Sequence, residues 1–388
     1  MSAAGGRSLD RMPTPTVEQV HAALSAVQDP EIHQPITDLG MVETIEVDAS
    51  GRVRVVVLLT VAGCPLRDTI TRDVTAAVGA VAGVTDVALE LGVMGDEQRR
   101  DLATRLRGGQ AEREIPFAQP GSLTRVYAVA SGKGGVGKSS VTVNVAVAMA
   151  AQGLRVGVLD ADIYGHSIPR MLGAHARPTQ VENMIMPPAA HGVKVISIGM
   201  FTAGNTPVVW RGPMLHRALQ QFLSDVYWGD LDVLLMDLPP GTGDIAISVA
   251  QLVPSAEILV VTTPQAAAAE VAERAGTIAL QTRQRIAGVV ENMSGFPCPH
   301  CGDVVDVFGS GGGRTVADAL SRSVGAEVPL LAQVPLDPRV REGGDDGQPL
   351  VLSDPAAPAA QALTAVATAL GRRQRGLAGL SLSISPAG

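Results

Sequence analysis

The sequence is poor in several features that mark particular classes of protein. Its 388 residues include three cysteines, too few for the disulfide framework of a small secreted protein. Lysine and arginine total 30 against 38 acidic residues, and the net charge of −8 argues against nucleic-acid binding driven by bulk charge. No stretch reaches the ~18 uninterrupted apolar residues of a membrane span, and the first residues lack the apolar core of a signal peptide. We therefore expect a cytoplasmic protein with neither nucleic acid nor a membrane as a partner.

The length and the apolar content, by contrast, are sufficient for two folded domains. Hydrophobic residues make up 46% of the chain and charged residues 18%, as in soluble globular proteins. Residues 14–93 follow an α–β–β–α–β pattern that predicts a small α+β domain. Its first helix begins at a capping box formed by Thr16 and Gln19, and its strands are expected at 42–47, 53–59 and 84–91.

The rest of the chain divides into a linker, a larger domain and a tail. Residues 94–122 are predicted to form a charged helix followed by a linker, and residues 374–388 a flexible tail. Between them, in residues 123–373, short apolar strands alternate with helices. This alternation predicts an α/β domain with a mostly parallel sheet covered by helices on both faces. Its strands are expected at 125–130, 154–159, 193–198, 232–237, 256–262, 286–291 and 329–334, and its last helix at 356–372.

A phosphate-binding loop follows the first of these strands. The stretch 131–140 matches the pattern G-x-x-x-x-G-K-[ST], and the apolar residues on either side supply the strand and the helix that the motif requires. Backbone N–H groups in such a loop hold phosphate oxygens, while the lysine reaches the β- and γ-phosphates and the serine hydroxyl binds Mg²⁺. The residues predicted to bind the nucleotide here are Gly132, Lys133, Gly134, Gly135, Val136, Gly137, Lys138, Ser139 and Ser140.

Lys133 is a second lysine, near the start of the loop, that the general pattern does not require. A lysine in this position is suited to contact the nucleotide of a neighbouring subunit. On spacing alone, an ordinary solvated lysine is the better interpretation.

Carboxylates end two of the predicted strands at the edge where the loop lies. Asp160 and Asp162 would bind Mg²⁺ through water or orient the attacking water, although they are also suited to cap the next segment. Asp237 ends another apolar strand and fits a second acidic residue beside Mg²⁺. Gly241 follows in a proline-flanked loop, where its N–H would meet the γ-phosphate and sense its presence. Asn292, at a third strand end, is suited to read the adenine edge, or is a plain turn asparagine.

Cys298 and Cys301 form a C-x-x-C turn in which both sulfurs can face one metal. Two thiolates do not complete a zinc site or an iron–sulfur cluster, each of which usually takes four ligands. A twofold dimer in which each subunit donates one pair solves this shortage, and zinc, iron–sulfur and redox-dithiol interpretations all remain open. His300 is not expected to be a ligand. Cys64, before a proline at a helix start, would receive or pass a metal or cluster, or is a structural cysteine.

Taken in order, these motifs resemble one protein family. With Gly-Lys-Gly-Gly-Val-Gly-Lys-Ser at 132–139, Leu-Asp-Ala-Asp-Ile-Tyr-Gly at 159–165, Asp-Leu-Pro-Pro-Gly-Thr-Gly-Asp at 237–244 and Glu-Asn-Met-Ser followed by Cys-Pro-His-Cys at 291–301, the chain resembles the Mrp/ApbC iron–sulfur cluster carrier ATPases. They belong to the deviant Walker A class, which also contains MinD, ParA and the nitrogenase iron proteins. The stretches at 29–31, 38–41 and 63–65 look like the small iron–sulfur assembly domain often fused ahead of such ATPases.

The resemblance implies roles for individual residues. Lys133 would be the signature lysine that contacts nucleotide across an ATP-bound homodimer. Asp160 or Asp162 would support hydrolysis, and Asp237 would lie by Mg²⁺. Cys298 and Cys301 would bind a bridging [4Fe–4S] cluster, destined for apo iron–sulfur proteins and received from assembly scaffold proteins. The segment at 210–213 also looks like part of the family pattern, without an assigned role. His166 departs from the expected pattern, in which proline follows Tyr-Gly.

Two other functions remain as alternatives. A partitioning or positioning ATPase like ParA or MinD would be expected to carry a basic face or a C-terminal amphipathic anchor, and the residues after 375 form neither. It would also leave the cysteine pair unexplained. A dimeric zinc protein with regulatory ATPase activity is compatible with the same residues.

Overall fold

The computed structural model divides the chain into two compact units. The residues that it describes are 14–30, 32–60, 67–106, 114–119, 121–162, 165–182, 184–201, 212–241, 244–265, 274, 277, 279–298 and 300–371. One unit comprises Met1–Glu112 with Thr179–Met186, and the other comprises Arg113–Pro178 with Pro187–Gly388. Expectations for residues 1–13, Cys64, Trp210 and the tail from 374 lie outside the described residues. None of the described helices combines the length and apolarity needed to cross a membrane.

The first unit has the order of elements that the sequence predicts. Its three-stranded sheet runs β1 (Val42–Val47), β2 (Arg52–Leu59) and β3 (Asp86–Val93), with β1 antiparallel and β3 parallel to β2. Helix α1 (Val17–Leu24) is capped by Thr16, whose side chain accepts from the Gln19 N–H while the Gln19 side chain accepts from the Thr16 N–H. Helix α2 (Arg67–Gly79) buries three apolar residues at helical spacing, so that one face packs inward: Ile70, Val74 and Val78.

The first unit also contains a hairpin that comes much later in the sequence. Helix α3 (Asp96–Leu106) contacts strand β6 (Thr179–Val181), which pairs antiparallel with β7 (Met184–Met186). Arg99 Nε lies 3.5 Å from Glu182 Oε1, and the three residues of β7 are buried. The first unit is therefore discontinuous in sequence, a feature that the linear pattern did not predict.

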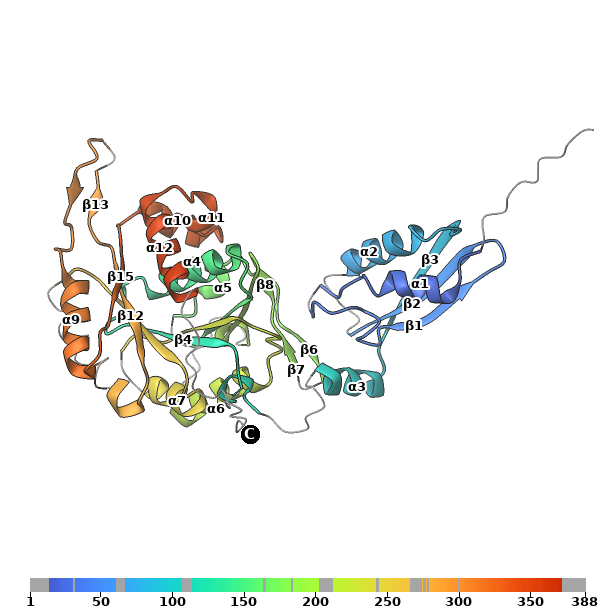
Figure 1. Ribbon diagram of the computed structural model, residues 1–388, viewed down its shortest axis with the longest axis horizontal. Helices are drawn as coiled ribbons and strands as arrows, with labels where there is room; N and C mark the ends of the chain where they lie inside the picture. The colour runs from blue at the N-terminus through green and yellow to red at the C-terminus, as the bar shows by residue number, and fades with distance from the viewer. Residues whose placement is uncertain are drawn as a thin grey trace, which may run out of the picture. The chain divides into compact units, whose positions relative to one another are not determined.

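The second unit is built on an eight-stranded sheet (Figure 1). Its strands run in the order β15 (Leu330–Val334), β12 (Ile286–Asn292), β11 (Glu257–Thr262), β4 (Arg125–Ala130), β10 (Val233–Asp237), β5 (Val156–Asp160), β9 (Val193–Ser197) and β8 (Ala189–Ala190). All pairings are parallel except that of β8 with β9. The predicted α/β fold class is confirmed, and the predicted strands differ from the observed ones by small shifts at their ends.

Helices cover this sheet on both faces. They are α4 (Lys138–Ala151), α5 (Ile168–Met171), α6 (Gly212–Ser224), α7 (Asp244–Leu252), α9 (Gly312–Val324), α10 (Pro338–Asp346), α11 (Leu350–Ser353) and α12 (Pro358–Gly371). Alternate residues of β11 show the two cores, because side chains alternate along a strand. Leu259 and Val261 pack in the core with α4 and α12, whereas Ile258 and Val260 pack with α9. Helices α6 and α7 lie on the side of the sheet away from α4 and α12 (Figure 1).

The register of the central strands brings the acidic strand ends together. Asp237, the last residue of β10, pairs with Val129 of β4 on one side and with Asp160 of β5 on the other. Because the strands are parallel, their carboxyl ends share one edge, and the loop after β4 begins at that edge. The fold thus places the glycine-rich loop and the two strand-ending aspartates next to each other.

Candidate functional site

The glycine-rich loop ends in a helix start that no side chain caps. Gly137, the residue before α4, has a φ of 78°, a left-handed conformation that glycine adopts at little cost. Because its N-cap residue is a glycine, α4 has no side-chain cap for the N–H groups of its first turn. Such N–H groups, together with the positive end of the helix dipole, suit an anion such as phosphate. The local geometry at 131–140 is therefore that of a phosphate cradle.

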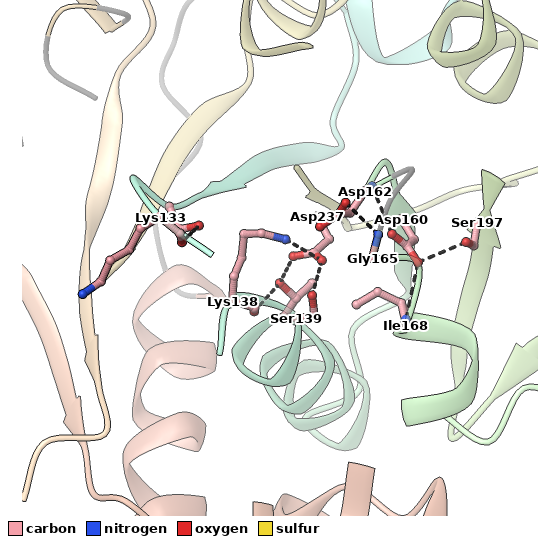
Figure 2. Close-up of polar contacts among 11 residues, drawn as sticks. Lys133, Lys138, Ser139, Asp160, Asp162, Gly165, Ile168, Ser197 and Asp237 are labelled. Atoms are coloured by element: carbon pink, nitrogen blue, oxygen red, sulfur yellow. Dashed lines mark hydrogen bonds and ion pairs between the residues drawn. The ribbon is translucent and has the colours of Figure 1, made fainter. Parts of the chain in front are cut away.

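Lys138 and Asp237 form a buried ion pair at the centre of the site (Figure 2). Lys138 Nζ lies 2.7 Å from Asp237 Oδ2, and the two side chains are 6% and 0% exposed. Ser139 Oγ donates to the same oxygen at 2.6 Å, and Thr142 Oγ1 donates to Oδ1 at 2.9 Å. Within the described part of the chain, the ammonium makes no well-aligned hydrogen bond besides this pairing. A buried lysine with one anionic partner and spare donors is equipped to bind a phosphate.

Asp160 is tied into the structure on several sides. Its Oδ2 accepts from Ser197 Oγ at 3.0 Å and from the Ile168 N–H at 3.4 Å, and its Oδ1 accepts from the Asp162 N–H at 3.2 Å (Figure 2). Burial, and next the charge of Asp237, raise the pKa of Asp160 to about 8. These contacts tie the backbones of Asp162 and Ile168 and the side chain of Ser197 to the end of β5.

Asp162 lies two residues further along the chain and is buried. Its Oδ1 accepts from the Gly165 N–H at 3.0 Å, closing the turn that follows the strand. The next residue, His166, is the departure from the family pattern, and its ring covers Gly199. A Cβ added to Gly199 would lie 1.6 Å from His166 Cδ2, so glycine is required where this ring packs. The departure is accommodated beside the site and leaves both aspartates in place.

Gly241 connects the loop after β10 to the glycine-rich loop. Its N–H donates to the Ser131 carbonyl at 2.9 Å, and its φ of 94° lies in the left-handed region. A contact between this N–H and a γ-phosphate would require the bond to Ser131 to open. The two loops also approach through Gly134, where an added Cβ would come within 3.9 Å of Pro240. The segment after Asp237 is thus positioned to respond to what the glycine-rich loop holds.

Lys133 points away from this cradle (Figure 2). Its ammonium donates to the side-chain oxygen of Gln265, which lies just after β11. The contact of Lys133 with a second subunit's nucleotide stays a prediction, since one chain is described.

Asn292 lies against the glycine-rich loop rather than open to a base. Its Nδ2 donates to the Val136 carbonyl at 2.9 Å, and the side chain is 8% exposed. A Cβ on Gly137 would lie 2.2 Å from Nδ2, which explains the glycine at this position. Asn292 thus fixes the loop from the end of β12, and a role in reading adenine stays a prediction.

The C-x-x-C turn is the tip of a short hairpin. Strands β13 (Phe296–Pro297) and β14 (Val304–Val305) pair antiparallel, and the Cys298 N–H donates to the Asp303 carbonyl at 2.8 Å. Cys298 is half-buried and Cys301 is exposed, and both are free thiols. The backbone N–H groups of His300 and Cys301, followed by the Cys301 side chain, lower the pKa of Cys298. A lowered thiol pKa favours the thiolate, the form that binds metals.

The cysteine pair has no third or fourth ligand from its own subunit in the described ranges. No group of three or more His, Cys, Asp or Glu side chains among those residues is arranged to hold a metal ion. The hairpin follows β12 and therefore starts at the sheet edge that also carries the phosphate cradle. A nucleotide site and a thiol pair thus share one edge of the sheet.

Three residues of the site escaped the sequence analysis. Thr142 lies one helical turn after Lys138 on α4, and that spacing is a usable signal. Ser197 ends β9, so the rule that sites gather at strand ends would have found it. Gln265 follows β11 and carries no recognisable motif, and nothing short of the structure pairs it with Lys133.

Comparison with known protein families gives two matches that together span most of the chain. The model of the family described as NUBPL iron-transfer P-loop NTPase matches residues 122–371. The model of the family described as iron-sulfur cluster assembly protein matches residues 17–90. The larger match contains the glycine-rich loop, the strand-ending aspartates and the cysteine hairpin described above.

Individual relatives agree with the family matches. The iron-sulfur cluster carrier protein of Mycobacterium tuberculosis (strain ATCC 25618 / H37Rv) is 66% identical over 367 residues, which cover 95% of this chain and 96% of the relative. The iron-sulfur cluster carrier protein of Deinococcus radiodurans is 46% identical over 351 residues, or 90% of this chain and 93% of the relative. A nucleotide-binding protein from Archaeoglobus fulgidus, solved in complex with ADP, is similar in structure with a TM-score of 0.50 and 36% identity, covering 60% of this chain and 92% of that chain.

Proposed function

This chain belongs to the iron-transfer P-loop NTPases, and we propose on that basis that it binds and hydrolyses ATP and carries an iron–sulfur cluster to apo-proteins. The observation that carries the proposal is the shared sheet edge. The phosphate cradle after β4 and the cysteine hairpin after β12 both start there, so one chain holds a nucleotide site and a thiol pair in the same unit. A partitioning ATPase would have no use for the pair.

The nucleotide would bind through the residues of the cradle. Phosphate oxygens take the place of the Asp237 carboxylate as partners of the Lys138 ammonium and receive the N–H groups at the start of α4. Mg²⁺ would be held by Ser139 and Asp237, with Asp162 as a further oxygen ligand. The donor set fits this ion, because a hydroxyl and a carboxylate oxygen already lie 2.6 Å apart and Mg²⁺ prefers oxygen ligands. When bound, Mg²⁺ neutralises charge on the phosphates.

Hydrolysis needs a positioned water more than it needs covalent chemistry. We assign the orientation of that water to Asp162, since its carboxylate follows the end of β5 at the sheet edge that carries the phosphate cradle. Asp160 positions the loop that carries Asp162 through its bonds to Ser197 and Ile168. Gly241 would report the γ-phosphate by exchanging its bond to Ser131 for one to the phosphate.

We assign to Lys133 a contact with the nucleotide of a second subunit. Its side chain leaves its own cradle, and an ammonium that faces outward from one phosphate site can reach the nucleotide of a twofold partner. We therefore propose a homodimer in which each subunit completes the other's site.

The cargo is proposed to be a [4Fe–4S] cluster bridging the same dimer. Cys298 and Cys301 supply two thiolates, and a second copy of the chain supplies the other two of the usual four ligands. The exposed position of Cys301 leaves the cluster open to exchange with apo-proteins and with the scaffold proteins that assemble it. The first unit, which matches the iron-sulfur cluster assembly family, is assigned to that exchange.

Anaerobic reconstitution tests the proposal. Full-length protein is reduced and incubated with iron and sulfide, and bound iron, bound sulfide and the visible absorption spectrum are measured beside the oligomeric state. We expect wild type to take up about four irons per dimer and to elute as a dimer. Cys298→Ala and Cys301→Ala should each lose most of this iron.

His300→Ala is the matched control, because His300 lies in the same turn and is not an expected ligand. It should keep the cluster. A wild-type protein without bound sulfide, or cysteine variants that take up as much iron as wild type, would overturn the carrier function. Stoichiometric zinc in protein purified without oxygen would favour the regulatory zinc ATPase instead.

A further inference from the structure

Gln265 is the described partner of the Lys133 ammonium, and it is a neutral one. The bond runs from Lys133 Nζ to Gln265 Oε1, and both groups are partly buried. A glutamine amide oxygen fixes the direction of the ammonium without neutralising its charge, whereas a carboxylate would form an ion pair that must be broken later. This partner thus leaves the lysine oriented and still charged, as a phosphate contact requires.

The residues just before Gln265 contact the start of α9, the helix that follows the cysteine hairpin. Gly312 lies in the first turn of α9, the helix that follows the hairpin. A Cβ on Gly312 would lie 2.6 Å from the Thr263 carbonyl oxygen and 2.7 Å from that of Pro264. These are backbone atoms, so the contact cannot relax by turning a flexible side chain. The segment that ends in Gln265 therefore packs directly against the start of α9.

The end of β12, just before the cysteine hairpin, also contacts the glycine-rich loop. Asn292, just before the hairpin, donates to the Val136 carbonyl at 2.9 Å. The neighbouring Glu291 is buried, and its Oε2 accepts from the Gly313 N–H, which closes the base between β12 and α9. Its Oε1 accepts from Ser294 Oγ at 2.6 Å. Asn292, before the hairpin, thus contacts Val136 of the glycine-rich loop. Gly312, after the hairpin, contacts the segment that ends in Gln265, which bonds Lys133 of the same loop.

We propose that Gln265 is the positioning residue for Lys133. We also propose that the bond between them couples nucleotide binding by Lys133 to the cysteine hairpin, through the contact of Pro264 with Gly312. When Lys133 leaves Gln265 for a nucleotide phosphate, the segment 263–265 loses the contact that holds it to the loop. The start of α9 follows, and the environment of Cys298 and Cys301 changes. This inference rests on the proposed function, because it needs a nucleotide that engages Lys133.

The reactivity of the cysteines toward an alkylating agent measures this coupling without any cluster. Full-length protein, reduced and metal-free, is treated with iodoacetamide in the presence and absence of a non-hydrolysable ATP analogue with Mg²⁺. Peptide mass spectrometry gives separate rates for Cys298 and Cys301. In wild type we expect the analogue to change at least one rate by about fivefold or more, the size of a usual coupling between sites. In Gln265→Ala the change should fall below about twofold, while the analogue still binds through Lys138.

A second substitution keeps the test decisive. Gln265→Glu keeps the side-chain size but places a carboxylate on Lys133, so the lysine should stay where it is and the nucleotide effect on the thiols should again be lost. It should also lower kcat for ATP more than it raises KM, a split that a merely structural role would not give. Gln152→Ala is the matched control, since Gln152 is an exposed glutamine that bonds Thr368 far along the chain, and it should behave as wild type.

The outcomes separate this inference from the proposed function. If wild-type thiols react at the same rates with and without the analogue, or if Gln265→Ala keeps the full change, the coupling through Gln265 is overturned. Cluster uptake by the same wild-type preparation is measured alongside. Uptake together with an unchanged thiol response would reject the coupling and keep the carrier function, whereas absence of uptake would reject the carrier function itself.

Discussion

The Lys138 ammonium lies 2.7 Å from the Asp237 carboxylate, and together they join the start of α4 to the end of β10 in a buried ion pair. Both partners are also the residues expected to meet the nucleotide and its metal. The pair thus keeps two buried charges compensated, and phosphate and Mg²⁺ would replace each partner for the other under the proposed function. Loss of one partner alone would leave the other charge uncompensated inside the protein.

Lys138→Met should abolish ATP binding and also destabilise the second unit by about 3 kcal/mol, because Asp237 is left as a buried, unpaired carboxylate. The double variant Lys138→Met/Asp237→Asn should recover much of that stability and still fail to bind ATP. Calorimetric titration measures the binding. Urea unfolding followed by Trp228 fluorescence, in a Trp210→Phe background, measures the stability. A single variant as stable as wild type would contradict the idea of a mutually dependent pair.

Gly137→Ala should prevent nucleotide binding more completely than Gly135→Ala. Both glycines have left-handed φ values, 78° and 79°, so alanine strains the backbone equally at the two positions. Only at Gly137 does the added Cβ collide with Asn292 Nδ2, at 2.2 Å, whereas nothing lies within 4 Å at Gly135. The difference in Kd for ATP between the two variants therefore reports the contact with Asn292. Adding Asn292→Ala to Gly137→Ala should restore part of the binding, and equal Kd values for the two glycine variants would refute this explanation.

Asp162→Asn should slow ATP hydrolysis by about 100-fold while Kd for ATP changes little, since a group that positions the attacking water acts on the chemical step. Asp160→Asn is the matched comparison. Because the pKa of Asp160 is raised to about 8, its carboxyl is mostly neutral at pH 7, and an amide of the same shape should preserve the fold there. Steady-state and single-turnover hydrolysis separate the two aspartates. A larger loss of kcat in Asp160→Asn than in Asp162→Asn would reverse the assignment.

Lys194 should give the second unit a pH dependence in the alkaline range. Its ammonium lies 3.1 Å from the Trp228 carbonyl and 4.8 Å from the centre of the Tyr227 ring, and burial lowers its pKa from 10.5 to about 8. Between these two pH values the folded lysine is neutral and the unfolded one is charged. Unfolding then takes up a proton, so the free energy of unfolding rises with pH in this window.

The variant Lys194→Met isolates that contribution. Wild type should gain on the order of 1 kcal/mol per pH unit relative to Lys194→Met between pH 8 and pH 10, and nothing below pH 7. Urea unfolding of both proteins at matched pH, followed by Trp228 fluorescence, gives the difference while other titrating groups cancel. A difference that is constant from pH 7 to pH 10 would show that the lysine keeps its ordinary pKa.

The sequence predicted well those parts of the molecule that depend on local pattern. The continuously apolar strands of the second unit predict a buried parallel sheet. The motif around Lys138 can be recognised from its immediate neighbours in the sequence. Strand ends such as Asp160 and Asp237 could be grouped because parallel strands share an edge. The carrier function also followed, through the order of motifs that ends in the cysteine pair.

Features that depend on contacts between distant segments could not be predicted. The bond between Lys133 and Gln265 joins residues 132 positions apart, and glutamine has no periodic or spacing signal. Asn292 was correctly placed at a strand end, but its amide faces a backbone carbonyl of the loop, a direction that only packing decides. Likewise, the position of Ser197 at a strand end is predictable, but its hydrogen bond to Asp160 is decided by packing between two strands.

The hairpin at Thr179–Met186 decides how this protein can be taken apart. It belongs to the first unit although the chain on either side of it belongs to the second. A single cut between residues 107 and 121 would therefore release an N-terminal piece that lacks strands β6 and β7 of its own unit. The two units are therefore not consecutive in sequence. A chimera that exchanges the first unit between relatives must exchange the hairpin at Thr179–Met186 together with the N-terminal stretch.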